Sequence, residues 1–236
     1  MKIVILGAGG LAREVLQLVK DIGKFNSRIE VCPNFVHPLS DNYVLHEKLE
    51  PIGFIDENQA NHGKIIHKVP VLGGFEWLKN ADSNTCLTMG VGFPRVRKKF
   101  FDIIQNLGLK FNFPVLVHPT AHIGENVKFG EGSQVMMNNS ITVDITVGEH
   151  VHINQGCSIG HDVVIGNFVY LSPHCVISGY TYIGEGADIG SNASTRPLSK
   201  IGAWSVLGLN AGVVKDIPER VIAVGCPAKP IKELLQ

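Results

Sequence analysis

His161 and Asp162 are adjacent side chains with a clear capacity for acid–base chemistry. An imidazole can accept a proton near neutral pH, and a neighbouring carboxylate favours the imidazolium that then forms. The pair could therefore act as a general base that takes a proton from an attacking amine or hydroxyl. A lone exposed histidine usually has no such role, so this interpretation depends on the elements that position it.

A glycine-rich segment at residues 7–12, with the sequence GAGGLA, is the second pattern suited to binding chemistry. It follows the apolar residues 2–6 and opens a segment with helical spacing of apolar residues. This is the G-x-G-x-x-A form of the dinucleotide fingerprint, in which the backbone approaches a phosphate at a helix N-terminus. A tight strand-to-helix turn without a ligand explains the same residues equally well.

Asp56 and Glu57 end a second apolar strand at residues 52–55. At the end of a parallel strand, an acid can accept hydrogen bonds from a ribose or a base. An acidic residue in an ordinary surface turn is the alternative.

The elements around His161 belong to a repeat over residues 117–218, in which a bulky apolar residue returns at every sixth position. Only Thr195 breaks this series, and the residue four places later is usually small, as at Cys157 and Cys175. A hexapeptide period predicts a parallel β-helix, because each short strand directs one large side chain into a narrow prism. The series is Val117, Ile123, Phe129, Val135, Ile141, Val147, Ile153, Ile159, Ile165, Leu171, Ile177, Ile183, Ile189, Thr195, Ile201, Leu207 and Val213.

A prism filled by aliphatic side chains has no interior site. Any function must therefore lie on its outside, at its ends or between neighbouring prisms. Residue His161 occupies the third position of its hexad and is expected to face outward.

The first 113 residues form a separate α/β unit in this interpretation. Residues 69–74 are predicted as an edge segment because of Pro70, residues 85–91 as a strand, and a helix is predicted to begin at Pro94. This alternation favours a Rossmann-like domain. The predicted organisation is therefore a Rossmann-like domain at 1–113 with an irregular insertion at about 25–50, a β-helix at 114–218 and a tail at 219–236.

Composition excludes several classes of function. The 236 residues include 21 basic and 21 acidic side chains, so the formal net charge is zero and no basic stripe is available for nucleic acid. No apolar run approaches the roughly 20 residues of a membrane span, and the N-terminus lacks the flanks of a signal peptide. We therefore expect a cytoplasmic protein. The cysteines at 32, 86 and 226 are scattered without the spacing of a zinc site, so no metal is expected.

Three stretches carry a resemblance to a known family: Ile159-Gly160-His161-Asp162 within the hexads, the Gly-Ala-Gly-Gly turn, and Val224-Gly225-Cys226-Pro227-Ala228-Lys229. With them, the chain resembles the bacterial hexapeptide-repeat sugar acyltransferases. This family includes sialic acid O-acetyltransferases and acetyl-CoA-dependent N-acetyltransferases of UDP-4-amino-4,6-dideoxy sugars. The resemblance covers almost the whole chain apart from the insertion.

The resemblance implies a left-handed β-helix with three hexads per coil, a homotrimer, and acetyl-CoA bound in the groove between adjacent β-helices. The seventeen hexads would then form nearly six coils in a prism roughly 27 Å tall.

The resemblance also implies roles for individual residues. His161 resembles the catalytic base of the family, and Asp162 resembles the acid beside it. Acceptor-binding positions of the family fall on Asn154, Gly9, Gly10, Leu11, Asp56, Glu57 and Gly92, and Arg97 is placed to help with phosphates. Positions that contact acetyl-CoA fall on Tyr170, Gly179, Ser191 and Leu209, and Lys215 and Lys229 are cations suited to the phosphates of CoA. Tyr170, Leu209 and Leu11 depart from the His, the Gly and the polar residue expected at these positions.

The implied function is direct acetyl transfer from acetyl-CoA to the 4-amino group of a nucleotide-linked 4-amino-4,6-dideoxy sugar. His161 would be the base, and the N–H of Gly179 would stabilise the oxyanion. No covalent enzyme intermediate is expected, because Cys157 is predicted to point into the prism.

Three alternatives stay open at this point. The first is O-acetylation of sialic acid or a related sugar. The second is a zinc-dependent hydratase that binds metal through histidines at subunit interfaces, and the third is a nucleotide-sugar-binding protein without catalysis. The histidines that make the second worth stating are His150, His152, His161 and His174, of which all but His161 are expected to be ordinary outward-facing residues.

Overall fold

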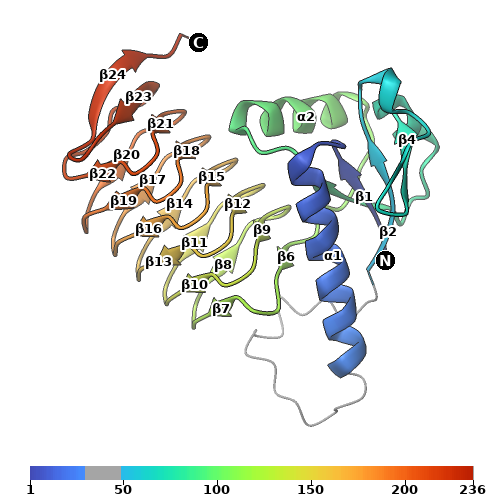
Figure 1. Ribbon diagram of the computed structural model, residues 1–236, viewed down its shortest axis with the longest axis horizontal. Coiled ribbons are helices and arrows are strands. Elements are labelled where there is room, and N and C mark those ends of the chain that lie inside the picture. The colour runs from blue at the N-terminus through green and yellow to red at the C-terminus, as the bar shows by residue number, and fades with distance from the viewer. Residues whose placement is uncertain (30–48, 236) are drawn as a thin grey trace. The chain divides into compact units, whose positions relative to one another are not determined.

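The computed structural model describes residues 1–29 and 49–235 and divides into two compact units (Figure 1). The first comprises Met1–Gly92 and Val96–Pro119, and the second comprises Phe93–Arg95 and Thr120–Gln236. Most of the predicted insertion, with Cys32, lies outside the described residues, although residues 25–29 continue a helix. Within the described ranges, no helix has the length and apolar character needed to cross a membrane.

The first unit contains a five-stranded sheet in the order β3-β4-β2-β1-β5. Strands β4, β2, β1 and β5 run parallel, and β3 is antiparallel at one edge. The strands are β1 (Lys2–Leu6), β2 (Glu50–Ile55), β3 (Ile65–Ile66), β4 (Val69–Gly73) and β5 (Cys86–Met89). The helices are α1 (Gly10–Ile29), α2 (Pro94–Asn106) and the short 3-10 helices η1 (Gln59–Asn61) and η2 (Phe75–Asn80).

Alternate residues of β1 pack into two different apolar clusters. Val4 and Leu6 pack with Ile104 of α2, whereas Ile5 packs with Ala12 and Val15 of α1. Because successive strand residues point to opposite faces, the two helices cover opposite faces of the sheet. The unit is therefore a mostly parallel α/β sheet with a helix on each face, and the narrower Rossmann-like interpretation remains a prediction.

The predicted helix start at Pro94 is confirmed, and the predicted edge position of residues 69–74 is wrong. Strand β4 is second from the edge, since β3 pairs outside it with Ile65 opposite Pro70. A proline is tolerated there because a partner of only two residues requires few ladder hydrogen bonds.

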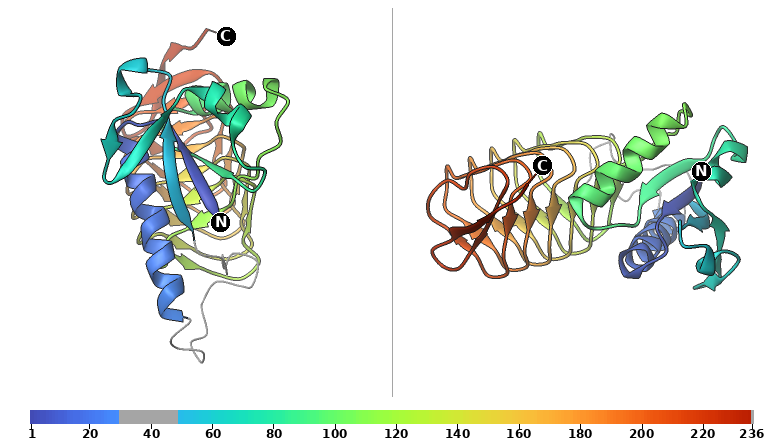
Figure 2. Two further views of the ribbon diagram at one scale, coloured as in Figure 1. Left: turned by 90° about the vertical axis from the view of Figure 1, so that its right-hand side faces the viewer. Right: turned by 90° about the horizontal axis from the view of Figure 1, so that it is seen from above.

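The second unit is a parallel β-helix of two-residue strands, and each apolar residue of the hexad series is the second residue of one strand. Strands 18 residues apart pair in register, as His152 does with Tyr170, so three strands make one coil. This confirms the predicted repeat, and the architecture fits the left-handed form of the β-helix. Figure 2 shows the coils stacked along one axis.

The β-helix has three flat faces, which we number by the order in which the chain visits them. Face 1 contains β6 (Leu116–Val117), β9 (Gln134–Val135), β12 (His152–Ile153), β15 (Tyr170–Leu171), β18 (Asp188–Ile189) and β21 (Val206–Leu207). Face 2 contains β7 (His122–Ile123), β10 (Ser140–Ile141), β13 (Ser158–Ile159), β16 (Val176–Ile177), β19 (Ser194–Thr195) and β22 (Gly212–Val213). Face 3 contains β8 (Lys128–Phe129), β11 (Thr146–Val147), β14 (Val164–Ile165), β17 (Tyr182–Ile183) and β20 (Lys200–Ile201).

The C-terminal residues extend face 1. Strand β23 (Val221–Val224) pairs in parallel with β21, and β24 (Lys229–Glu233) pairs with β23 in an antiparallel hairpin.

Apolar side chains fill most of the interior of the β-helix. Cys157 and Cys175 are buried, and both thiols donate hydrogen bonds to the carbonyl of Ser172. The hydrogen bond to Cys157, together with burial, raises the pKa of Cys175. The prediction that these cysteines fill the core is confirmed, so neither is placed to attack a substrate.

Candidate active site

His161 and Asp162 lie at the edge where face 2 meets face 3, which we call corner 2–3. Residues 160–163 turn this corner between β13 and β14. Asp162 has a φ of 58°, in the left-handed region, and the matching residues Asp144 and Tyr180 of the neighbouring coils have φ of 58° and 57°. This conformation turns the chain so that the side chain before it points away from the prism.

The imidazole of His161 contacts Asp162 directly, with 2.8 Å between Nδ1 and Oδ2. An ionised carboxylate can only accept, so this contact places the proton of a neutral imidazole on Nδ1. The lone pair is then on Nε2, which is the atom that can take a proton from a substrate. The side chain of His161 is 55% exposed, so it is open to a ligand.

The next turn of the same corner, residues 178–181, encloses the imidazole on one side. The rings of Tyr180 and His161 meet edge to face, with 5.1 Å between centroids and an interplanar angle of 88°. A Cβ added to Gly179 would lie 2.8 Å from both Cε1 and Nε2 of His161. The main chain at Gly179 therefore passes beside the nitrogen that Asp162 leaves available, where its N–H could donate to a developing oxyanion.

Asn154 lies at the other end of β13, at the edge where face 1 meets face 2, which we call corner 1–2. Its side chain is nearly buried: Nδ2 donates to the hydroxyl of Tyr170 at 3.1 Å, and Oδ1 accepts from the N–H of Gln155 at 2.9 Å. One whole face of the prism thus separates Asn154 from His161. A single chain does not bring these two predicted site residues together.

The predicted cofactor positions divide between the same two edges. Gly179 lies at corner 2–3, whereas Ser191 and the exposed Leu209 follow Asn154 along corner 1–2. Tyr170 lies on face 1, where its ring stacks on His152 with 5.0 Å between centroids. Lys215 and Lys229 are exposed near the C-terminal end of the coils.

In the first unit, the predicted acceptor glycines lie at the carboxyl ends of β1 and β5. Gly7 has a φ of 106°, and an added Cβ would lie 2.9 Å from Cγ1 of Val91, so the turn after β1 packs tightly against the loop after β5. Gly9 and Gly10 are exposed, with Leu11 and Gly92 partly buried. Strand β2 lies on one side of β1, and β5 lies on the other, so the order of the strands reverses at β1. Ligands bind at such topological switch points in α/β sheets.

Asp56 and Glu57 are already engaged in local hydrogen bonds. Asp56 accepts from the N–H of Asn58 and from the amide of Asn61, while its carbonyl lies 2.7 Å from Nε2 of His62. Glu57 accepts from the N–H of Phe75 at 2.9 Å. Asp56 therefore shapes its own turn, Glu57 connects that turn to the start of η2, and a ligand would have to share their remaining lone pairs.

Arg97 does not fit the role predicted for it. Its side chain is fully buried, and Nη1 donates to the carbonyl of Val91 at 2.9 Å. From this position the guanidinium holds the loop after β5 and does not reach a phosphate in solvent. The resemblance placed Arg97 by its position in the sequence alone, which does not show that this side chain is buried.

The four histidines considered for a metal site lie on different parts of the β-helix. His152 lies on face 1, and His150 lies at the edge where face 3 meets face 1. His161 lies at corner 2–3, and His174 lies at corner 1–2. In residues 1–29 and 49–235, no three His, Cys, Asp or Glu side chains are placed to hold a metal ion. His150 and His152 were expected to be ordinary outward-facing residues. Both are instead buried from solvent, and they stack on Phe168 and Tyr170 respectively.

Sequence reasoning missed two residues near the site. Tyr180 contacts His161 because it lies 18 residues after Asp162, and the coil period alone could have identified it. Arg13 places Nη2 3.9 Å from the position a Cβ on Gly10 would take, so a cation lies beside the glycine-rich turn.

Comparisons with known proteins agree with this architecture. The family model described as "Bacterial transferase hexapeptide (six repeats)" matches residues 144–179. A curated protein of Schizosaccharomyces pombe whose name includes acetyltransferase is 48% identical over 46 residues. The match spans 20% of this chain and 22% of that relative.

Solved structures match over nearly the whole chain. The acetyltransferase domain of PglB from Neisseria gonorrhoeae is 29% identical with a TM-score of 0.80, over 98% of this chain and 99% of that chain. The same domain in complex with acetyl coenzyme A is 28% identical with a TM-score of 0.80, over 98% of both chains. PerB from Caulobacter crescentus in complex with CoA and GDP-perosamine is 26% identical with a TM-score of 0.77, over 98% of both chains.

Three findings point to the same kind of protein. They are the six-residue repeat, the family match within it and the similarity to solved acetyltransferases over both units. The chain carries the bacterial transferase hexapeptide repeat and is similar over nearly its whole length to the PglB acetyltransferase domain and to PerB, as expected of a hexapeptide-repeat sugar acyltransferase.

Proposed function

We propose that this protein transfers the acetyl group of acetyl-CoA to the amino group of a nucleotide-linked 4-amino-4,6-dideoxy sugar. The observation that carries the proposal is the exposed His161–Asp162 pair, whose available nitrogen faces the main chain of Gly179. Acetyl coenzyme A bound to the PglB domain and GDP-perosamine bound to PerB support the choice of donor and acceptor class.

In the proposed reaction, the amine nitrogen attacks the thioester carbonyl while Nε2 of His161 takes its proton. Asp162 stabilises the imidazolium, and the N–H of Gly179 donates to the oxyanion. The C–S bond then breaks, and the CoA thiolate takes the proton from His161. Transfer is direct, since the thiols of Cys157 and Cys175 are closed inside the prism.

The site is proposed to form between neighbouring copies in a closed trimer. His161, Asp162 and Gly179 of one chain would face Asn154, Ser191 and Leu209 of the next, because one chain holds these two groups at different corners. Tyr170, Lys215 and Lys229 would contact the donor, and the Gly9–Leu11 turn with Asp56, Glu57 and Gly92 would hold the nucleotide end of the acceptor.

Thiol release from acetyl-CoA tests the proposal, measured with a panel of UDP- and GDP-linked 4-amino sugars and with free sialic acid. We expect turnover with an amino sugar, and a loss of about 10²–10⁴-fold in His161→Ala at unchanged thermal stability. His122→Ala is the matched control, because His122 is an exposed histidine of the same β-helix on face 2. Turnover with sialic acid alone would replace N-acetylation with O-acetylation, and full activity of His161→Ala would exclude the proposed base.

A further inference from the structure

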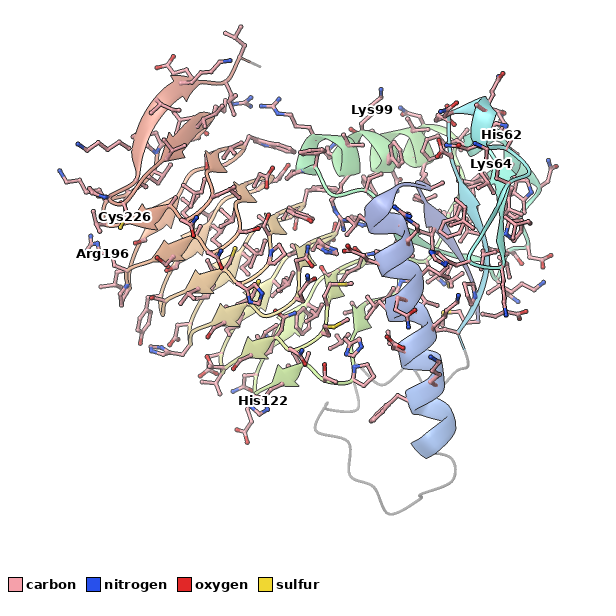
Figure 3. The ribbon with its side chains drawn as sticks, in the orientation of Figure 1. His62, Lys64, Lys99, His122, Arg196 and Cys226 are labelled. Carbon is pink, nitrogen blue, oxygen red and sulfur yellow. The ribbon has the colours of Figure 1, made fainter. Side chains whose placement is uncertain are left out.

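Thr195 interrupts the apolar series of the prism one coil beyond the turn that encloses His161. Its side chain is 6% exposed. Arg196, the next residue, extends to the outside of the β-helix (Figure 3). Placing a hydroxyl among aliphatic side chains is unfavourable unless it is hydrogen-bonded. The hydroxyl of Thr195 is hydrogen-bonded to Ser178 and Thr181.

The hydroxyl of Thr195 replaces a main-chain acceptor at corner 2–3. In four of the five coils described there, the first N–H of the corner donates to a carbonyl in the next coil: Gly124, Thr142, Gly160 and Arg196 donate to Ile141, Ile159, Ile177 and Val213. In the remaining coil, the N–H of Ser178 donates to Oγ1 of Thr195 at 3.0 Å. The carbonyl of Thr195 accepts instead from the hydroxyl of Ser178.

The strand pairing changes at the same place. Strands β13 and β16 pair at two positions, whereas β16 and β19 pair only at Val176 and Ser194. Oγ1 of Thr195 also lies 3.1 Å from Oγ1 of Thr181, at the far end of the turn. Both ends of residues 178–181 are therefore attached to one buried side chain.

This turn carries the groups that contact His161. Gly179 passes beside Nε2, Tyr180 packs against the imidazole, and the N–H of Tyr180 donates to the carbonyl of His161 at 3.0 Å. A change in the tilt of the Ser178–Gly179 peptide would move the N–H of Gly179 relative to the reacting atoms.

We propose that Thr195 is a positioning residue, which orients the Gly179 N–H and the Tyr180 ring against His161 from inside the prism. The proposal rests on the proposed function in assigning the Gly179 N–H to the oxyanion. On this proposal, Thr195 is the one polar residue of the hexad series because the active site needs its hydroxyl, whereas the fold does not.

The test compares Thr195→Val with Thr195→Ser in the full chain. Valine keeps the shape and removes the hydroxyl, so kcat should fall about 10-fold while both KM values stay unchanged, because a donor displaced by a fraction of an ångström still permits binding. Serine keeps the hydroxyl and should restore kcat. Ser205→Ala is the matched control: it removes a buried hydroxyl that donates to the carbonyl of Gly202 at another corner, and it should leave kcat unchanged.

A second measurement needs no substrate. The rate at which diethyl pyrocarbonate modifies His161, followed by mass spectrometry, should differ from wild type in Thr195→Val and not in Ser205→Ala. If wild type shows no acetyl transfer, the proposed function fails and these rates still test the positioning role. A folded Thr195→Val with wild-type kcat and wild-type modification rate would overturn the proposal.

Thr181→Val covers the case in which Thr195→Val does not fold. It leaves Thr195 in place and removes the hydroxyl that contacts it at the far end of the turn. Its kcat and its modification rate at His161 should change in the same direction as expected for Thr195→Val, and wild-type values of both would contradict the proposal.

Discussion

The carboxylate of Asp162 controls which nitrogen of His161 is available, through the 2.8 Å contact at Nδ1. Asp162→Asn keeps an oxygen at this position but removes the charge that stabilises the imidazolium. We expect kcat to fall roughly 10-fold or more, since the base loses part of a 10²–10⁴-fold contribution, with thermal stability unchanged.

Asp144→Asn is the control for this prediction. Asp144 has the same left-handed conformation one coil earlier and accepts from Asn126 at 3.0 Å, but it precedes the coil of His161. Steady-state kinetics on both variants check the prediction, and an equal effect of the two would show that Asp162 serves only the turn.

Asp188 is the residue for which the structure predicts a dependence of stability on pH. Burial raises its pKa from the ordinary 3.8 to about 6, between Tyr170 and Val206 on face 1. The folded state therefore holds the proton of Asp188 more tightly than the unfolded state does. The contribution of Asp188 to the free energy of unfolding is most favourable below pH 4 and falls as the pH rises from about 4 to about 6.

Asp188→Asn removes that titration. Relative to wild type, its free energy of unfolding should rise by up to about 3 kcal/mol above pH 6 and show little difference below pH 4. Urea unfolding at pH 4, 5, 6 and 8 measures the difference. A constant difference across this range would show that Asp188 is not the group responsible.

At the scale of the element, the turn of residues 178–181 is useful only because its main chain can approach His161. Gly179→Ala would put a Cβ 2.8 Å from Cε1 and Nε2 of the imidazole, so the ring or the turn must move. We expect about a 10²-fold loss of kcat, with little change in thermal stability, since the displaced imidazole is exposed.

Pro197→Ala is the control for the glycine variant, because Pro197 occupies the same repeat position one coil later. It should retain kcat. Wild-type kcat in Gly179→Ala would mean that His161 takes another rotamer during catalysis.

At the scale of the whole molecule, the repeat separates residues that one site would need together. His161 and Asn154 are held at different corners of the same coil, with β13 between them. A site that uses both must therefore draw them from two chains, as in a closed ring with heterologous contacts.

Mixing two inactive variants tests this arrangement. His161→Ala and Asn154→Ala, denatured together and refolded at equal concentrations, should recover about a quarter of wild-type activity, because one interface in four pairs an intact His161 with an intact Asn154. The variants refolded separately are the control. No recovery in a mixture that forms mixed oligomers would place the two residues in different sites.

The sequence by itself determined the β-helix, because its signal is local: one apolar side chain every six residues fills the prism whatever the rest of the chain does. It also predicted that His161 and Asp162 could act as a pair, since adjacency in sequence makes them neighbours at a corner. The start of α2 at Pro94 was predictable for the same reason.

Only the tertiary structure decided which residues surround that pair. Gly179 and Tyr180 meet His161 across one coil, and Thr195 reaches the same turn across another, so their contacts depend on the 18-residue register. The burial of Arg97, His150 and His152 could not be predicted either, because the identity of a charged or polar residue does not show whether its side chain contacts solvent or packed neighbours. Local spacing specifies strands and turns, whereas the environment of a side chain is set by segments far away in the chain.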